Sequence, residues 1–530
     1  MSVNHPAVHV LENELWRDVH FFNDGERCTR YEIRWLGASL EEQLRNVGAG
    51  ISAVLKDAFD NARPLRVPGG RWSLSTISKP EGSMLDLSNY RRIGPVPAPW
   101  LGAAAPAPVV PMLIGAGITI NVINRELAAQ GLALQTSGAS DGQTLAGAIA
   151  TGTHGADLRV GALHDTVLAL HIVVSPTESV LIQGESGVLN QQAAQSLSDW
   201  FGIPCRLLSD DQLFRAAQVH LGSLGVVLNV VLAAVPLYYW SRHRTPHRDG
   251  AAWRAVLRTR EPHNANALHF QQPDYLQFIL NPYSPEPATE PRAWITSMRK
   301  LAYAQQQPGV STKVSDVSSR SDLAAFLPAI IKVFQSHADA WLDPVLRGIT
   351  SLQLREFYGN QPLADAALPG VMFGPPGFFG LDFDPARGAS AEYVFDAEQA
   401  RDGVEIILNT LDAQLAAHNQ YFGGIGVRFV KGSNAWLAPN AKPLNTFVEL
   451  QGLYTTELPA IHSAIGEALT TAGIAYCGHW GQWELNTPEV ARRWWGEHAI
   501  ESWQAARADL LSSAARHVFA SPILKVAGLE

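Results

Sequence analysis

The stretch LAGAIATGTHG, from Leu145 to Gly155, constrains the fold of this chain most strongly, because it combines three glycines and three alanines with a single histidine. A wall of such small side chains lets a flat aromatic ring approach the backbone closely, and inward-facing amides of a glycine loop hold a diphosphate without a lysine. The alternative interpretation is that the glycines only make turns and that Ala148 and Ala150 only pack a helix. The stretch is therefore a candidate wall for a planar cofactor.

A second glycine loop lies at Gly69 and Gly70, in the segment VPGGRWS. The apolar run from Pro64 predicts a short strand that leads into this loop, and the segment is suited to phosphate binding. Gly115 and Gly117 begin like a dinucleotide fingerprint, but the third glycine of that motif is absent. An NAD-linked dehydrogenase is therefore poorly supported, and nicotinamide binding by a colourless protein would be its sign.

Hydrophobic periodicity predicts alternating helices and strands along the chain. Ser39 opens a Ser-x-x-Glu capping box before an amphipathic helix that ends at Phe59, and Thr119 caps a helix from Ile120 to Gln130. Further helices are expected at Ala397–Asn419 and Val490–Arg516, and strands at Met84–Leu87, Met112–Ile118, Leu163–Val174, Ser179–Ile182, Val226–Tyr239, Phe378–Phe383, Ala391–Phe395, Ile425–Val430 and Thr446–Leu453. This mixture predicts an α+β fold.

The chain of 530 residues is long enough for two domains. From Trp240 onward, regular periodicity gives way to a segment rich in Arg, His, Pro and aromatic residues. We therefore expect a first domain over residues 1–239 and a second over 240–487, built from an antiparallel sheet covered by helices. A helical segment over residues 488–530 is expected to return its apolar face to the first domain.

Composition argues against several classes of partner and site. The formal net charge is −9 and no basic run occurs, so nucleic acid and anionic membranes are not expected partners. Cys28, Cys205 and Cys477 are far apart and form no CxxC motif, which argues against a disulfide framework and a metal site. The amino terminus does not resemble a leader and no apolar stretch reaches membrane-spanning length, so we expect a cytoplasmic protein; its oligomeric state stays open.

The first 240 residues carry five motifs whose order and spacing resemble a known family. They read VPGGRWSLS, LDLSNY, LIGAGITINVINRELAAQGLAL, TLAGAIATGTHGADLRVGALHDTVLALHIV and AAQVHLGSLGVVLNVVLAAVP. The series resembles the FAD domain of the vanillyl-alcohol oxidase and p-cresol methylhydroxylase (PCMH) superfamily, and within it the alditol, sugar-lactone and sterol oxidases. The resemblance implies a PCMH-type FAD-binding domain of two subdomains, followed by a substrate-binding cap domain.

The resemblance also implies which residues contact the cofactor, FAD. It places a pyrophosphate loop around Gly69, a flavin wall along residues 147–155 and the adenosine side near Gly222. The expected FAD contacts are Pro68, Gly69, Gly70, Arg71, Trp72, Ser73, Ser137, Gly138, Gly142, Thr144, Gly147, Ala148, Thr151, Gly152, His154, Gly155, Gly222, Gly225 and Val226.

Many relatives bond the flavin covalently to a histidine of the first loop, and some add a second bond through a cysteine. Here the first loop has Gly70-Arg71-Trp72 instead, and no cysteine lies between Gly155 and Gly161. The resemblance therefore implies FAD held without a covalent bond. His154 is expected to brace its loop through the backbone rather than to transfer a proton. Three further histidines are expected to be packing residues: His164, His171 and His220.

Two C-terminal segments, GIGVRFVKGSNAWLAP at residues 424–439 and CGHWGQWE at 477–484, resemble substrate-side motifs of the family. Arg428 matches the arginine of the first motif, but Gly426 stands where the family has an acid. Gln482 likewise replaces a lysine of the second motif. Both changes remove charges that would orient a polyol, so the oxidation of ordinary sugar alcohols is in doubt.

Four residues are expected to carry the substrate-side chemistry: Arg428, His479, Glu449 and Gln482. Arg428 would stabilise charge, and His479 would contact the flavin or the substrate hydroxyl. The alternatives are a surface ion pair for Arg428 and packing against Trp480 for His479.

Strand alternation places Phe447, Glu449 and Gln451 on one face. If that face meets the cavity, Glu449 supplies the missing acid, and a solvated edge is the open alternative. Glu392 matches a family acid on a central cap strand and is expected to be structural. Core packing is also the expected role of six aromatic residues that would otherwise line an apolar pocket: Phe373, Phe378, Phe379, Trp483, Trp494 and Trp495.

The resemblance implies an FAD-dependent oxidoreductase that takes hydride from a small CH–OH substrate to flavin N5, with O2 as the expected acceptor. The altered polar residues favour an aromatic or hydrophobic secondary alcohol, or a biosynthetic intermediate, over a free sugar alcohol. The alternative is a flavin-binding protein with a binding or scaffold role, because the linkage histidine, the acid and the lysine are missing. Anaerobic bleaching of the flavin by a substrate distinguishes the two.

Overall fold

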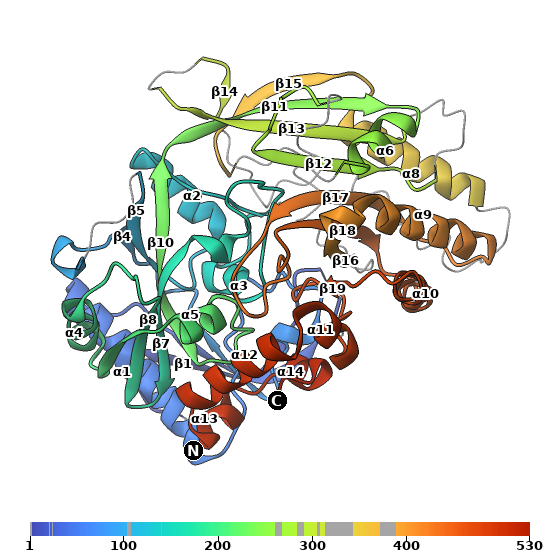
Figure 1. Ribbon diagram of the computed structural model, residues 1–530. Helices are drawn as coiled ribbons and strands as arrows, with labels where there is room; N and C mark the ends of the chain where they lie inside the picture. Colours follow the sequence, from blue (N-terminus) through green and yellow to red (C-terminus); the bar gives the residue numbers. More distant parts are fainter. Residues whose placement is uncertain are drawn as a thin grey trace.

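The computed structural model describes residues 3–20, 22–23, 25–102, 108–138, 140–259, 268–283, 291–304, 308–312, 343–370 and 388–530. These residues form mixed helices and sheets in two parts, and Figure 1 shows the segment up to about residue 236 and the C-terminal helices after residue 487 below the part formed by the segment between them. Three sheets are present, with three, seven and nine strands. The expected α+β fold is confirmed.

The first subdomain joins the three-stranded sheet to a long helix. Helix α1 (Leu40–Asp60) begins as predicted, because the Ser39 hydroxyl accepts a hydrogen bond from the Glu42 amide. The carboxylate of Glu42 accepts from the Ala38 amide, one residue before the expected position. The sheet consists of β1 (Val8–Trp16), β2 (Glu26–Ile33) and β3 (Ser83–Asp86). The strand expected from Pro64 is only an isolated bridge between Arg66 and Met84.

The second subdomain is built on a seven-stranded sheet in the order β4-β5-β10-β7-β8-β9, with β6 also paired to β10. Its strands are β4 (Ile93–Pro95), β5 (Val110–Gly115), β6 (Leu132–Leu134), β7 (Val167–Ser175), β8 (Glu178–Gln183), β9 (Cys205–Ser209) and β10 (Val226–Pro236). Its helices are α2 (Ile120–Ala129), α3 (Leu145–Ala150), α4 (Gln191–Phe201) and α5 (Asp211–Gln218). The central strand β10 is almost wholly buried, as its apolar sequence predicts.

The single strand expected over Val226–Tyr239 is wrong, because the chain changes sheets within it. Strand β10 ends at Pro236, and β11 (Tyr238–His247) begins the nine-stranded sheet of the second part. Between them, the Leu237 amide donates to the Gly131 carbonyl and leaves the ladder. The change of sheet therefore falls three residues before the boundary expected at Trp240.

The cap domain is a nine-stranded sheet in the order β14-β15-β11-β13-β12-β17-β18-β16-β19, antiparallel except between β14 and β15. Its remaining strands are β12 (Tyr275–Leu280), β13 (Ala293–Ala302), β14 (Val310–Ser311), β15 (Leu363–Ala367), β16 (Gly388–Asp396), β17 (Gly423–Lys431), β18 (Leu444–Leu453) and β19 (Cys477–Gly478). Its helices are α6 (Ala251–Leu257), α8 (Asp343–Tyr358), α9 (Ala400–Ala416) and α10 (Leu458–Thr471).

The two faces of this sheet have different neighbours. Val427 and Phe429 of β17 join the apolar core formed with α6, α9 and α10. Arg428, between them, points to the opposite face, as strand alternation requires. The cap thus turns its polar side chains toward the first part of the chain. The expected strand Phe378–Phe383, with the aromatic residues Phe373, Phe378 and Phe379, lies outside the described residues.

The C-terminal segment forms several short helices instead of the single one expected. They are α11 (Pro488–Trp495), α12 (Glu497–Leu510), α13 (Ser513–Val518) and α14 (Pro522–Ala527). Gly496, with φ of +79°, separates the first two, a conformation that favours glycine. These helices contact the first part of the chain: the Trp503 indole donates to the Val219 carbonyl, and the Leu65 amide donates to the Val518 carbonyl.

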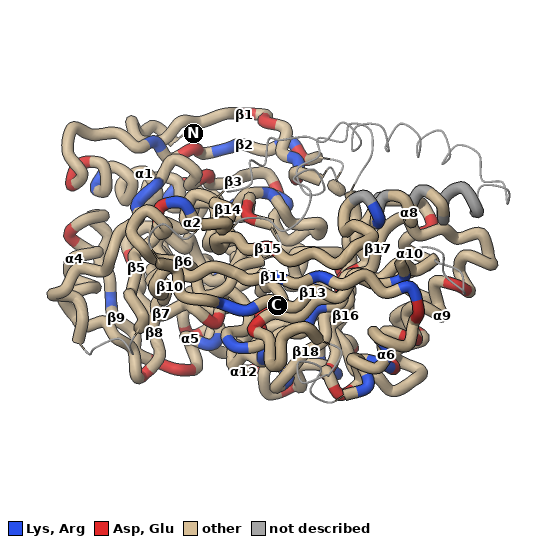
Figure 2. Tube along the Cα trace, turned by 90° about the horizontal axis from the view of Figure 1, so that it is seen from above, with Lys and Arg blue, Asp and Glu red and all other residues tan. Residues whose placement is uncertain are grey.

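Charged residues are distributed over the whole molecule. Seen from above, basic and acidic positions alternate along the trace without a stripe of one sign (Figure 2). Among the described helices, none combines the length and apolarity needed to cross a membrane.

Candidate active site

One cavity lies between the first part of the chain and the cap, and both contribute to its lining. Of the expected site residues, Pro68, Gly69, Gly70, Arg71, Trp72, Ser73, Thr144, Gly147, Thr151, His154, Gly222, Arg428, Glu449, His479 and Gln482 line it. The structure therefore brings three motifs of the first part, those of Gly69, Gly147 and Gly222, to the same place as the two cap motifs and Glu449.

The two glycine loops pack directly against each other. A Cβ atom added at Gly69 would lie 2.5 Å from the Thr144 hydroxyl, and one at Gly70 would lie 2.5 Å from the Gly142 carbonyl. One at Gly142 would overlap the Trp72 indole. Glycine is therefore required for the close approach of the loops, a stronger reason than turn formation alone.

The stretch from Leu145 to Gly155 begins with the short helix α3. Its N-cap is Thr144, whose hydroxyl accepts from the Gly147 amide at 3.4 Å. Gly147, Ala150 and Thr151 face the cavity, whereas Ala148 is buried in the core below. The cavity wall here consists of small side chains and backbone, as the sequence predicted.

The remaining expected FAD contacts lie behind this wall and do not line the cavity. They are Ser137, Gly138, Gly142, Ala148, Gly152, Gly155, Gly225 and Val226. Gly152 and Gly225 have φ of +79° and +121° and abut Pro439 and Val173, so their conformation shapes the loops. Val226 begins the buried strand β10.

Arg66 is a cavity residue that the sequence reasoning missed. It is 4% exposed, and its guanidinium donates to the carbonyls of Ile77, Gly222 and Ala520 at 2.5, 3.2 and 3.3 Å. Its Nε atom has no partner, and no acid of the described chain forms an ion pair with it. Burial lowers the pKa of Arg66 to about 10, so it stays cationic beside the glycine loop. The only sequence signal is its position just before VPGG.

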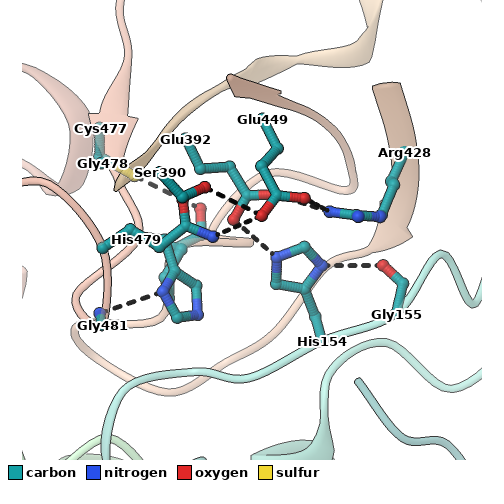
Figure 3. A network of polar contacts seen from close by, with 12 residues as sticks. His154, Gly155, Ser390, Glu392, Arg428, Glu449, Cys477, Gly478, His479 and Gly481 are labelled. Atoms are coloured by element: carbon teal, nitrogen blue, oxygen red, sulfur yellow. Dashed lines mark hydrogen bonds and ion pairs between the residues drawn. The ribbon is translucent and has the colours of Figure 1, made fainter. Parts of the chain in front are cut away.

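A cluster of three charged side chains faces the cavity from adjacent cap strands (Figure 3). Arg428 Nη1 lies 2.6 Å from Glu449 Oε2 and 3.3 Å from Glu392 Oε1, and all three are almost fully buried. Burial alone would lower the pKa of Arg428, but Glu449 and Glu392 hold it above its ordinary value. Glu392, expected to be structural, belongs to this cluster.

Glu449 occupies the cavity face, so the solvated-edge alternative is wrong. It lies directly opposite Gly426 in the β17–β18 register, where a side chain on residue 426 would meet the Arg428 guanidinium and Glu449 Cβ. Its Oε1 accepts from Gln482 Nε2 at 3.1 Å and lies 3.0 Å from Ser390 Oγ. An acid from the neighbouring strand therefore stands opposite the glycine that replaces the family acid.

His154 connects the two parts of the molecule. One ring nitrogen, Nδ1, lies 2.8 Å from the Gly155 carbonyl, which is the expected loop brace. The other, Nε2, lies 3.1 Å from Glu392 Oε2, and the ring packs 3.8 Å from the Phe447 ring. The sequence did not predict this link to the cap.

His479 presents a neutral ring to the cavity. Its Nδ1 accepts from the Gly481 amide at 3.0 Å, so Nε2 carries the proton. Burial lowers the pKa of His479 to about 4, against the opposing effect of Glu392. The Leu74 amide donates to the Gly481 carbonyl at 2.7 Å, which ties this loop to the first glycine loop.

The expected packing roles of other residues are confirmed where the structure describes them. His171 is held between Asn229 and Ser179, and burial lowers its pKa to about 3. His164 bonds Ser433, and His220 accepts from the Gly222 amide. Trp483, Trp494 and Trp495 pack outside the cavity lining. His20, which the sequence reasoning did not consider, lines the cavity edge-on to Trp72.

Comparison with known proteins gives a family match and a fold match. Residues 49–182 match the family described as FAD binding domain. The chain is 26% identical to L-gulonolactone oxidase of Mus musculus over 47% of each chain. It is 32% identical to D-arabinono-1,4-lactone oxidase of Yarrowia lipolytica over 42% of this chain and 35% of that protein. The alignments thus span about half the length, or less, of these relatives.

Among solved structures, cholesterol oxidase from B. sterolicum is similar over 98% of this chain and 97% of its own, with a TM-score of 0.67 and 12% identity. This similarity shows a shared fold. Together with the family match, it agrees with the two glycine loops and the cap described above. The chain therefore contains an FAD-binding domain of the PCMH type, within the fold that cholesterol oxidase also adopts.

Proposed function

We propose that this protein is an FAD-dependent oxidoreductase that removes hydride from a carbon bearing a hydroxyl group, with FAD held non-covalently. The observation that carries the proposal is a single cavity with a glycine-loop wall on one side and the Arg428, Glu449 and Glu392 cluster on the other. Relatives named as lactone oxidases and a lactone dehydrogenase support the reaction class.

The residues present fit FAD. The loop at 68–73 and the wall at 144–151 would hold it through backbone amides and small side chains, because residues of both line the cavity and glycine lets the two backbones approach each other. Arg66 supplies an unpaired positive charge for a phosphate. The loop at 68–73 contains no histidine that could bond the flavin. When bound, FAD supplies the hydride acceptor.

The cap residues have separate roles in this proposal. Glu449 takes the proton of the substrate hydroxyl, while Arg428 keeps that carboxylate in place. His479 contributes a neutral ring to the cavity, since burial lowers its pKa to about 4. Arg428 is already paired with Glu449 and Glu392, so a neutral hydroxylated substrate, an alcohol or a lactone, fits best. We propose O2 as the acceptor.

Anaerobic mixing of the purified holoprotein with a panel of substrates tests this function. The panel contains L-gulono-1,4-lactone, D-arabinono-1,4-lactone, cholesterol and aromatic secondary alcohols. We expect one class to bleach the flavin, and Glu449→Gln to keep the flavin but bleach 10²–10⁴-fold more slowly. Glu467→Gln, an exposed acid of the same domain, is the matched control. A protein that dithionite bleaches but no panel member does would favour the scaffold alternative.

A further inference from the structure

Both ring nitrogens of His154 face hydrogen-bond acceptors (Figure 3). Nδ1 lies 2.8 Å from the Gly155 carbonyl, which only accepts, so Nδ1 carries a proton. Nε2 lies 3.1 Å from Glu392 Oε2, and a neutral imidazole has no second proton to place there. The pair therefore holds one proton more than a neutral histidine beside a carboxylate would.

The surroundings of Glu392 place that proton on the histidine. Glu392 Oε1 accepts from Arg428 at 3.3 Å, which favours the carboxylate. Burial alone would raise the pKa of Glu392, but the charge and hydrogen bond of His154, with His479 and Arg428, lower it to about 2. Glu392 is 1% exposed, so its charge needs these partners.

We propose that His154 is a buried imidazolium that, by neutralising Glu392, is a positioning residue which balances the charge of the Arg428, Glu449 and Glu392 cluster across the boundary between the two domains. Two carboxylates, Glu392 and Glu449, then face two cations, Arg428 and His154. With a neutral His154 this cluster would carry one excess negative charge. The effect on the cofactor described below rests on the proposed function, whereas the protonation state does not.

No other group near His154 replaces it in this balance. The His479 ring, 5.6 Å away, is neutral. His164, in the same domain as His154, is buried, and burial lowers its pKa. Strand β18 contributes the uncharged Phe447 and the acid Glu449, and β17 contributes Arg428. Within the described residues, His154 is therefore the only partner that supplies the second positive charge.

The same residues also resemble a metal site, which the test must separate from the ion pair. One ligand atom each from His154, Glu392 and His479 lies within 4.8 Å of the others. However, His479 Nδ1 already accepts from the Gly481 amide, and His154 Nε2 points at a carboxylate. A divalent cation there would displace the proton that we assign to His154.

NMR of the full-length protein with ¹⁵N-labelled histidine tests the protonation state directly, with His154→Gln to assign the signal. At pH 7 we expect both His154 nitrogens to appear as N–H in the wild type and only one in Glu392→Gln. A singly protonated His154 in the wild type would overturn the proposal. So would a bound divalent ion whose removal by EDTA changes the His154 signal.

Reduction of the bound flavin tests the charge balance. Reduction adds negative charge to a flavin, and a nearby cation stabilises it. We expect His154→Gln to lower the equilibrium constant for two-electron reduction about tenfold, or about 30 mV. The double variant His154→Gln/Glu392→Gln removes both charges and should return within threefold of the wild type.

The double variant separates electrostatics from structure. If it is no closer to the wild type than His154→Gln alone, a merely structural role is supported and the proposal is overturned. If the protein takes up no FAD, the proposed function fails, and the NMR result still decides the state of His154. Should His154→Gln fail to fold, the comparison of wild type with Glu392→Gln gives the same decision.

Discussion

The FAD-binding domain and the cap line one cavity with different kinds of groups. On the first side, the lining consists of backbone and small side chains, which allow close packing, at Gly69, Gly147 and Thr151. On the other side, Arg428 and Glu449 offer charges that are buried and mutually paired. One wall is shaped by conformation and the other by electrostatics.

Because the two walls differ in this way, substitutions in them should have different effects. A change on the glycine side acts through volume, so it should expel the cofactor while leaving the charges of the cap intact. A change on the cap side acts through charge, so it should alter stability or chemistry while the cofactor stays bound. Arg66 is the exception, because it is a buried cation on the side of the cavity formed by the glycine loops.

Arg428→Met should give the largest effect on stability. It removes the cation between Glu392 and Glu449 and leaves two buried carboxylates without it, which costs about 3–5 kcal/mol for a broken buried pair. Urea unfolding measures the loss. Arg401→Met, an exposed arginine on α9, is the control and should change little. A loss below about 1 kcal/mol would mean that the cap wall is not electrostatic.

Gly69→Ala should have the next largest effect and should act on the cofactor. Its Cβ would lie 2.5 Å from the Thr144 hydroxyl, and such overpacking costs about 1–3 kcal/mol. We expect FAD binding about 10-fold to 100-fold weaker, measured by flavin fluorescence during titration. Gly94→Ala has open space around the new atom and should bind like the wild type. Equal FAD affinity of the Gly69→Ala and Gly94→Ala variants would show that close packing of the glycine wall does not determine cofactor binding.

Acidification should destabilise both domains, because each holds neutral buried histidines. The pKa of His171 in the first domain is about 3 and that of His462 in the cap is about 4, both lowered by burial. Below pH 6.5 these histidines bind protons in the unfolded chain but stay neutral in the folded chain. The free energy of unfolding therefore falls as the pH drops from 6.5 toward 4.

Either His171→Asn or His462→Asn should reduce this slope by about 1.4 kcal/mol per pH unit. Urea unfolding at pH 5, 6 and 7 gives the slope for each variant. A slope that changes with only one of the two substitutions would show that the domains differ in more than their cavity walls.

Ser390→Ala should give the smallest effect. It removes one neighbour of the Glu449 carboxylate, at 3.0 Å, while Gln482 and Arg428 remain. One hydrogen bond to a charged group contributes about 1.5–3 kcal/mol at most, and the remaining partners compensate in part. We expect the rate of flavin bleaching to fall about tenfold with FAD binding unchanged. A larger loss of FAD than of rate would contradict this order.

The glycine wall was predictable because its signals are local. The relevant residues lie in short motifs rich in glycine and alanine, a composition that predicts close approach of the backbone: Gly69, Gly70 and the Thr144–Gly155 stretch. Helix α1 was likewise predictable from its cap and its apolar spacing. Resemblance to a family added the role of these loops to a pattern that was already visible.

The charged wall was harder to predict because its partners meet only in the folded chain. His154 and Glu392 are separated by 238 positions, and neither local sequence marks the other. Strand β11 was missed because Arg242 and Arg244 interrupt its apolar pattern while pointing to a buried polar face. Glu449 was anticipated from strand alternation, but only the β17–β18 register places it opposite Gly426.

The visible spectrum of the purified protein, before and after acid precipitation, tests the central claim that this cavity holds FAD without a covalent bond. We predict a yellow protein whose flavin passes entirely into the supernatant with the precipitated chain left colourless. A colourless preparation that takes up no added FAD, or flavin that stays with the precipitate, would contradict the account.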